Sequence, residues 1–85
     1  MHYEIAYAQS ALKSLRKLDR GVARRIIQAI DALAHDPRPH GCKQVKGGDG
    51  EMRIRIGDYR VIYDISDDEV LILVLRVGHR REIYR

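Results

Sequence analysis

Hydrophobic positions repeat with two different periods, and the change of period separates a helical first half from a strand-rich second half. Residues 2–7 alternate polar and apolar, which is typical of a short strand. Over residues 8–18 and 22–33 the apolar positions recur every three or four residues, with basic residues opposite them. Asp19 can cap the second helix, and Asp36-Pro37 should end it, because the residue before proline avoids the α region. These segments predict an antiparallel helical hairpin.

The second half of the chain predicts three strands. A loop over residues 37–50 holds both prolines and four glycines, and residues 52–56 then alternate apolar with basic. Gly57-Asp58 is a plausible two-residue hairpin turn into a second alternating run at 59–65. Residues 70–75 are apolar throughout, as in a strand covered on both faces. The order β-α-α-β-β-β predicts an α+β fold, in which the helical hairpin packs on one face of an antiparallel sheet.

Composition and charge narrow the classes of function. A chain of 85 residues with 45% apolar residues should fold as one domain, 1–85. Sixteen Lys and Arg against twelve Asp and Glu give a net charge of +4, which favours an anionic partner. The single cysteine, Cys42, excludes a disulfide framework, and the four histidines lack metal-ligand spacing. The histidine spacing predicts no metal site, and with no apolar run of about 20 residues and no signal-peptide pattern we expect a cytoplasmic protein.

The predicted hairpin gathers arginines on one face. If Gly57-Asp58 is the whole turn, Arg55 lies opposite Arg60, and Arg53 lies on the same face. Like charges directly opposite one another destabilise a sheet, so selection for folding alone would favour a glutamate at one of these positions. Guanidinium groups match phosphate oxygens well, and the pattern therefore indicates a bound polyanion. An ordinary solvated strand face is the alternative interpretation.

The C-terminal segment is the second candidate for chemistry. Residues 76–85 combine four arginines with His79, Glu82 and Tyr84, which are side chains able to contact phosphate or transfer protons. Arg80 and Arg81 add positive charge within this segment. A solvated chain end is the alternative, although Ile83 and Tyr84 have little use in a purely solvated tail.

These motifs together resemble RelE-type toxins of bacterial and archaeal toxin–antitoxin modules, over essentially the whole chain. The resemblance rests on five segments: Leu15-Arg16-Lys17-Leu18, Lys43-Gln44-Val45-Lys46-Gly47, Met52-Arg53-Ile54-Arg55-Ile56, Asp58-Tyr59-Arg60-Val61-Ile62-Tyr63 and Val77-Gly78-His79-Arg80-Arg81-Glu82-Ile83-Tyr84. The last two segments are the most specific. Membership of this family implies cleavage of mRNA in the ribosomal A site, without a cofactor, and inhibition by a cognate antitoxin similar to RelB.

The resemblance also implies roles for individual residues. The family's functional positions correspond here to Arg60, Arg80 and Tyr84 for catalysis and to Lys46, Arg53 and Arg55 for RNA binding. The family commonly has lysines at the last two positions, and an arginine cannot usefully release its proton, because its pKa exceeds about 12. Proton transfer then falls to Tyr84, His79 or Glu82. A tyrosine base needs its pKa lowered from about 10, which clustered arginines favour.

The implied reaction is attack of the ribose 2′-OH on the adjacent phosphorus. Arginines would stabilise the extra negative charge of the phosphorane, and Tyr84 would take the proton or stack on a base.

Two other classes of function stay open at this point. One is a ParE-type toxin that acts on DNA gyrase, and the other is a non-catalytic nucleic-acid-binding domain that uses the basic strand face alone.

Overall fold

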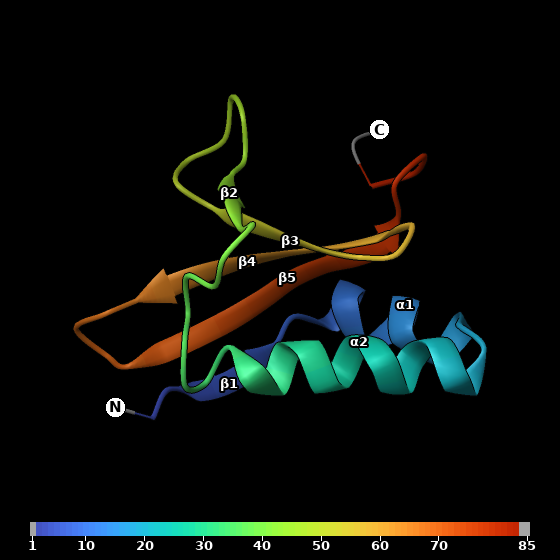
Figure 1. Cartoon of the computed structure of the whole chain (residues 1–85), viewed down its shortest axis with the longest axis horizontal. Helices are drawn as coiled ribbons and strands as arrows, with labels where there is room; N and C mark the ends of the chain where they lie inside the picture. The colour runs from blue at the N-terminus through green and yellow to red at the C-terminus, as the bar shows by residue number, and fades with distance from the viewer. Residues whose placement is uncertain (1, 84–85) are drawn as a thin grey trace.

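Two helices cover one face of a five-stranded sheet in the computed structural model, which describes residues 2–83 (Figure 1). The elements in chain order are β1 (Glu4–Tyr7), α1 (Gln9–Lys17), α2 (Arg20–Ala32), β2 (Lys43–Gln44), β3 (Met52–Ile56), β4 (Tyr59–Ser66) and β5 (Leu71–His79). The α+β class and the helical hairpin predicted from the sequence are confirmed. Neither helix in residues 2–83 has the length and apolar character that crossing a membrane requires.

The helical hairpin forms where the apolar spacing places it. Asp19 caps α2, since its side chain accepts a hydrogen bond of 3.2 Å from the backbone N–H of Gly21. Each helix turns one stripe toward the sheet, and the buried positions of the two stripes are Ala11, Leu15, Ile26 and Ile30. The sheet meets these stripes with side chains that are fully buried: Val61, Tyr63, Ile72 and Val74. The core therefore lies between the helices and the middle strands.

The sheet is mixed, whereas the sequence predicts an antiparallel one. Its strand order is β1-β5-β4-β3-β2, and β1 pairs parallel with β5 while the other pairs are antiparallel. The helical hairpin carries the chain from β1 to the opposite edge of the sheet, and the meander then returns strand by strand until β5 meets β1. The strand β2 lies inside the predicted 37–50 loop and pairs with β3 through two residues only.

The hairpin of β3 and β4 has the register that the sequence predicts. Ile56 pairs with Tyr59, Arg55 with Arg60, and Gly57-Asp58 is the connection. Gly57 has a φ of +59°, which a glycine adopts without the steric cost that a side chain would bring. The two-residue turn therefore fixes which side chains of the hairpin share a face.

Polar contacts hold the loop between α2 and β2 against the sheet. The hydroxyl of Tyr63, inside the core, donates a hydrogen bond of 2.7 Å to the carbonyl oxygen of Pro37. Asp67 accepts hydrogen bonds from the Tyr3 hydroxyl at 2.7 Å and from the Arg38 guanidinium at 3.1 Å. These contacts lower the pKa of Asp67, with the larger effect coming from Arg38. The loop is thus fixed at both the core and the surface before it enters β2.

Candidate nucleic-acid interface

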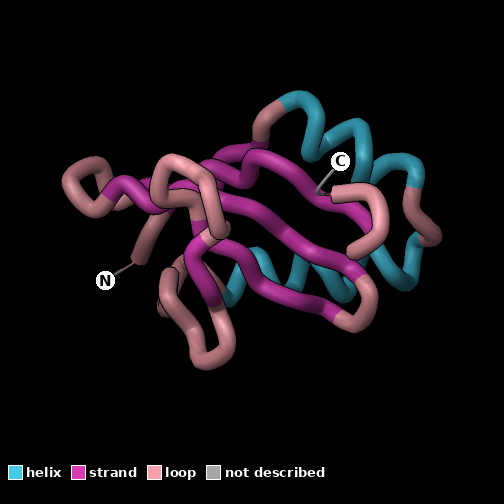
Figure 2. Tube along the Cα trace, turned by 90° about the horizontal axis from the view of Figure 1, so that it is seen from above, coloured by secondary structure: helices cyan, strands magenta, loops and turns pink. Residues whose placement is uncertain are grey.

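The face of the sheet away from the helices carries two rows of cations across the strands, and Figure 2 looks onto it. Because cross-strand partners share a face, the rows follow from the pairing. The row nearest the hairpin turn contains Arg55, Arg60 and Gly78. The next row contains Lys43, Arg53, Ile62 and Arg76. We call the surface formed by Lys43, Arg53, Arg55, Arg60 and Arg76 the cationic face. Its rows are roughly 7 Å apart, the spacing of alternate residues in a strand.

A bulge in β5 places Arg76 on the cationic face. The register between β4 and β5 shifts between Ile62 and Tyr63, so that Tyr63 pairs with Val74 but Ile62 pairs with Arg76. Strict alternation from Val74 would turn Arg76 toward the core. The extra residue instead lets Val77, like Val74, be buried, while Arg76 is exposed.

Arg60 is held rigidly beside the hairpin turn. The residue is 7% exposed, and its Nη1 donates hydrogen bonds to the carbonyl oxygens of Gly57 at 3.2 Å and Tyr59 at 3.0 Å. Charged donors give stronger hydrogen bonds than neutral ones, and the two acceptors fix the direction of the guanidinium. A positive charge with a fixed position suits a group that must meet one phosphate.

The segment after β5 folds back onto the same end of the cationic face. Gly78 pairs with Arg60, and a Cβ at Gly78 would lie 3.7 Å from the Cβ of Ile83, which is buried. Ile83 therefore packs over Gly78 on the Arg60 side of the sheet. The backbone N–H of Arg80 donates a hydrogen bond of 2.8 Å to the carbonyl oxygen of Asp58 in the hairpin turn. Arg60 and Arg80 are thereby brought to one corner of the molecule.

The Arg80 side chain at this corner is held only weakly by the carboxylate of Asp58. Its Nε lies 3.9 Å from a carboxylate oxygen of Asp58, and the two side chains are 52% and 68% exposed. Such an exposed ion pair contributes little free energy in water. A phosphate that carries full charge and binds the guanidinium at two points can replace this contact.

Lys46 lies at the other end of the cationic face. It lines a hollow of about 670 Å³ together with Lys43, Arg53 and the backbone of Gly47 and Gly48. Within this hollow, three cations border one space beside a glycine-rich turn. Arg53 belongs to both the hollow and the second row of cations, and it therefore connects Lys46 to the rest of the face.

Most of the site residues expected from the sequence meet at one surface. The hairpin corner collects Arg55, Arg60 and Arg80, while Lys46 and Arg53 lie toward β2. His79 pairs with Tyr59, whose ring packs against the core, and so lies on the opposite face of the sheet from Arg60. Arg81 and Glu82 are exposed on the turn after β5. Tyr84 lies outside the described residues. The sequence indicated Arg76 only as part of the basic 76–85 segment, and it did not single out Lys43. The strand β2 is too short to show a period, and the bulge in β5 changes the face on which Arg76 lies.

The remaining candidates for reactive or metal-binding side chains are Cys42 and the histidines and carboxylates of the described residues. Cys42 is a partly buried free thiol beside the core. Among residues 2–83, no group of three or more His, Cys, Asp or Glu side chains is placed to hold a metal ion.

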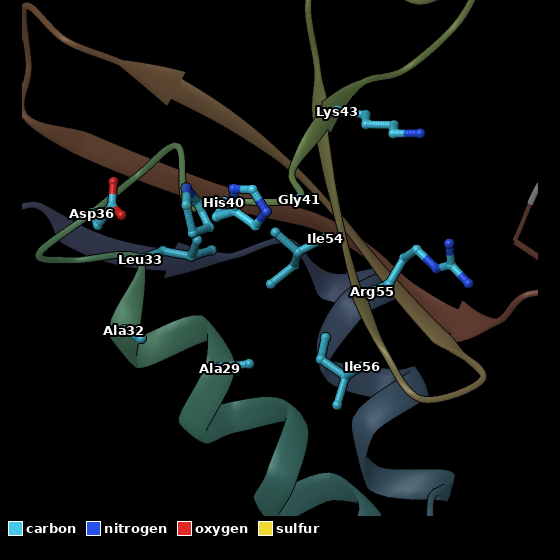
Figure 3. A pocket seen from close by; sticks show the side chains of 11 residues that line it. Ala29, Ala32, Leu33, Asp36, His40, Gly41, Lys43, Ile54, Arg55 and Ile56 are labelled. Atoms are coloured by element: carbon cyan, nitrogen blue, oxygen red, sulfur yellow. The ribbon is translucent and has the colours of Figure 1, made fainter.

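A second surface feature is an apolar groove between α2 and β3 (Figure 3). It has a volume of about 580 Å³, and its floor is mainly aliphatic: Ala29, Ala32, Leu33, Ile54 and Ile56. Lys43 and Arg55 border it on the strand side, and their side chains point away from the helix (Figure 3). β2 pairs with β3 only as far as Arg53, so the rest of β3 is a sheet edge within the described chain. Apolar lining beside an open strand edge is typical of a surface that contacts another protein.

Comparison with known proteins shows which family and which solved structures the chain is similar to. Residues 5–84 match the family described as the ParE toxin of the type II toxin–antitoxin system, parDE. Toxin RelG of Mycobacterium tuberculosis is 30% identical over 86 residues, which cover all of this chain and 99% of that protein. The mRNA interferase toxin RelE of Escherichia coli strain K12 is 29% identical over 87 residues, which cover 99% of this chain and 92% of that protein. In a crystal structure of the archaeal RelE–RelB complex from Pyrococcus horikoshii OT3, one chain superposes with a TM-score of 0.82 at 28% identity, with 96% of this chain and 99% of that chain covered.

Proposed function

Because the chain belongs to the ParE toxin family of type II toxin–antitoxin systems, we propose that it is a RelE-type toxin that cleaves mRNA. The observation that carries the proposal is the meeting of Arg60 and Arg80 at one corner of the cationic face. The similarity to a relative named mRNA interferase supports RNA as the substrate. An mRNA substrate, met in the ribosomal A site, places the action of the toxin in the cytoplasm.

The cationic face provides the RNA-binding surface in this proposal. Arg53 and Arg55 bind phosphates that neighbour the cleaved one, and Lys46 extends the contact into the hollow beside β2. Lys43 and Arg76 extend the second row and bind the same strand. Arg81 adds positive charge on the turn after β5. Phosphate contacts of this kind position the RNA without reading its sequence.

The reaction that we propose uses the substrate's own nucleophile. The ribose 2′ oxygen forms a bond to phosphorus as the bond to the 5′ oxygen breaks, which leaves a 2′,3′-cyclic phosphate and a 5′-OH. Arg60 and Arg80 stabilise the negative charge that accumulates on the phosphorane. The base takes the proton of the 2′-OH, and the departing 5′ oxygen takes up a proton from water. Tyr84 is the base that we favour, and His79 is the alternative.

An antitoxin is the second partner in this proposal. The groove between α2 and β3 offers an apolar floor and a sheet edge, and its rim carries Lys43 and Arg55. An antitoxin segment with apolar side chains toward the floor and acidic ones toward the rim is complementary to it. Such a segment would reach the edge of the cationic face, because Lys43 and Arg55 belong to both surfaces.

Loss of the Arg80 side chain tests the proposed chemistry. We expect Arg80→Ala to lower single-turnover cleavage of ribosome-bound mRNA about 100–1000-fold, the usual cost of removing one preorganised charge contact. Growth arrest on expression without antitoxin should disappear, while the unfolding temperature stays unchanged, because Arg80 is exposed. Arg24→Ala is the matched control: it removes an exposed arginine from α2, and its activity should equal that of the wild type.

Three further experiments test the nucleophile, the base and the two other classes of function. A 2′-deoxy substitution at the cleaved nucleotide should block cleavage, and Tyr84→Phe should remove most of the cleavage without weakening RNA binding. Full toxicity of Arg80→Ala would contradict the assignment of this residue. Inhibition of gyrase supercoiling by the wild type, with intact mRNA in primer extension, would identify a ParE-type activity instead. RNA binding without cleavage or gyrase inhibition would leave the non-catalytic binding domain.

A further inference from the structure

From the hydrogen bonds around His79 we infer that this residue is a positioning residue for Arg80 and not the base. The inference rests on the proposed function, since it concerns the residue that directs the guanidinium of Arg80 to the phosphorane. His79 ends β5 and pairs with Tyr59 of β4, whose ring it meets edge-on with centroids 5.5 Å apart. Both the backbone and the ring of His79 are therefore fixed against β4, directly before Arg80.

His79 closes the turn that follows it in the manner of a helix N-cap. Its ring Nδ1 accepts a hydrogen bond of 3.2 Å from the backbone N–H of Arg81. Its carbonyl oxygen accepts from the N–H groups of Glu82 at 2.8 Å and Ile83 at 3.1 Å. A side-chain acceptor for the N–H two residues ahead, with the carbonyl accepting from the next residues, is the N-cap arrangement. The turn over residues 80–83 thus depends on the His79 side chain for one of these bonds.

This arrangement decides which ring nitrogen can exchange a proton. A neutral imidazole has one N–H donor and one acceptor, and Nδ1 acts as the acceptor here. The proton of the neutral ring is then on Nε2, which can donate to a phosphate oxygen but cannot accept the proton of a 2′-OH. The nitrogen that could accept it is occupied by the Arg81 N–H. His79 in this geometry is unsuited to general-base catalysis.

The same contacts determine where Arg80 points. Its backbone N–H is bonded to the carbonyl oxygen of Asp58, and the three bonds to His79 fix the residues directly after it. Ile83 completes the turn by packing over Gly78. With the turn closed at both ends, the Arg80 side chain leaves the backbone in one direction, toward Asp58 in the hairpin turn. Without the ring acceptor, a fraction of molecules would hold the turn open, and the rate would fall by that fraction.

The test compares two substitutions of His79. Asparagine lacks a titratable ring but is among the best N-cap residues, whereas alanine has no acceptor. We expect His79→Ala to lower single-turnover cleavage by at most about five-fold, because one lost cap shifts the equilibrium between the closed and the open turn by about that factor. His79→Asn should recover the rate to within about two-fold of the wild type. If His79 were the base, both substitutions would instead lower the cleavage rate about 100-fold or more. Equal, large losses in the two variants would overturn the inference.

A double-substitution cycle tests whether His79 acts through Arg80. In an Arg80→Ala background, His79→Ala should produce no further loss, because the residue being positioned has been removed. Full additivity of the two losses would overturn the proposed link. Unfolding temperatures of all variants are measured alongside, so that a loss through global unfolding is recognised.

Two measurements decide the geometry without any cleavage, and they separate this inference from the proposed function. The ¹⁵N chemical shifts of the His79 ring should identify Nε2 as the protonated nitrogen at neutral pH. Hydrogen exchange at the Arg81 amide should be slowed in the wild type and in His79→Asn, and should be faster in His79→Ala. A proton on Nδ1, or equal exchange in all three proteins, would refute the arrangement. Absence of cleavage by the wild type with these signatures intact would refute the proposed function alone.

Discussion

At the scale of single residues, Tyr63 shows how one polar atom inside the core organises a loop. Its ring is fully buried between the sheet and the helices, while its hydroxyl bonds the carbonyl oxygen of Pro37 at 2.7 Å. Among residues 2–83 no buried side-chain nitrogen or oxygen is left without a hydrogen-bond partner. Burial raises the pKa of Tyr63 well above its ordinary value, because the phenolate would lose its hydration.

Removal of the Tyr63 hydroxyl should destabilise the protein without changing its fold. We expect Tyr63→Phe to lower the free energy of unfolding by about 1–2 kcal/mol, because the Pro37 carbonyl oxygen loses its buried partner. Urea unfolding at neutral pH measures the change. Tyr3→Phe is the matched control: it also removes one tyrosine hydroxyl, but from an exposed hydrogen bond with Asp67. A cost for Tyr3→Phe equal to that for Tyr63→Phe would contradict the role of burial.

The raised pKa of Tyr63 also predicts how stability depends on pH. The folded protein keeps the phenol proton at pH values where the unfolded chain, with a pKa near about 10, has lost it. The unfolded state then binds fewer protons, so stability is complete below about pH 10 and falls as the pH rises further. Burial raises the pKa of Tyr7 in the same direction. Urea unfolding between pH 8 and pH 11 should show a smaller decline for Tyr63→Phe than for the wild type.

At the scale of elements, the hairpin of β3 and β4 combines a stable register with an unfavourable charge pattern. The two-residue turn and the alternation of apolar side chains place Arg55 directly opposite Arg60. Arg60 is buried against backbone carbonyls, while Arg55 is exposed. A sequence optimised for the fold would have an acid at position 55, and the cost of the arginine is consistent with use of the face for binding.

Charge reversal at Arg55 should raise the stability of the fold while it weakens RNA binding. Arg55→Glu should raise the free energy of unfolding by a few tenths of a kcal/mol, up to about 1 kcal/mol, because an opposite charge then faces Arg60. The same variant should bind RNA more weakly and with a smaller dependence on salt. Arg24→Glu makes the same charge change on α2 and should leave RNA binding unaltered. Thermal unfolding and salt titrations of RNA binding measure both effects. Unchanged RNA affinity in Arg55→Glu would show that the cationic face does not meet RNA.

At the scale of the whole molecule, two binding surfaces share residues at the β2–β3 corner. Lys43 and Arg55 belong both to the cationic face and to the rim of the apolar groove. The net charge of +4 favours acidic partners at either surface. An antitoxin in the groove and an RNA on the face would therefore compete for the same cations, and this competition offers a physical basis for inhibition.

The groove makes a specific prediction about the antitoxin. Ala32→Glu introduces an acidic side chain at an exposed position that lines the groove, and it should weaken antitoxin binding by repelling acidic residues and blocking the floor. Gln28→Glu adds the same charge to an exposed position of α2 outside the groove lining, and should bind nearly as well as the wild type. Calorimetric titration at low and high salt measures both variants. We expect wild-type affinity to fall as salt rises; affinity independent of salt would argue against an acidic partner.

The sequence by itself determined the parts of the molecule that local physics controls. Apolar spacing fixed the helices, because one stripe must be buried, and the cap at Asp19 followed from side-chain chemistry. The turn at Gly57-Asp58 fixed the register of its hairpin, and with it the shared face of Arg53, Arg55 and Arg60. Part of the candidate site therefore follows from alternation and turn chemistry alone, whereas the role of Tyr84 stays a prediction.

Only the tertiary structure decided which distant segments meet. The parallel pairing of β1 with β5 depends on the path of the whole chain, and no local pattern specifies it. Arg76 joins the cationic face through a bulge at the end of the apolar run 70–75, and this run has no alternation that would reveal the bulge. Lys43 joins it through a strand of two residues, which forms only because β3 is there to pair with it. The groove and the hydrogen bond from the Arg80 N–H to Asp58 likewise join separate elements, and the long-range packing that creates them leaves no periodic signal in the sequence.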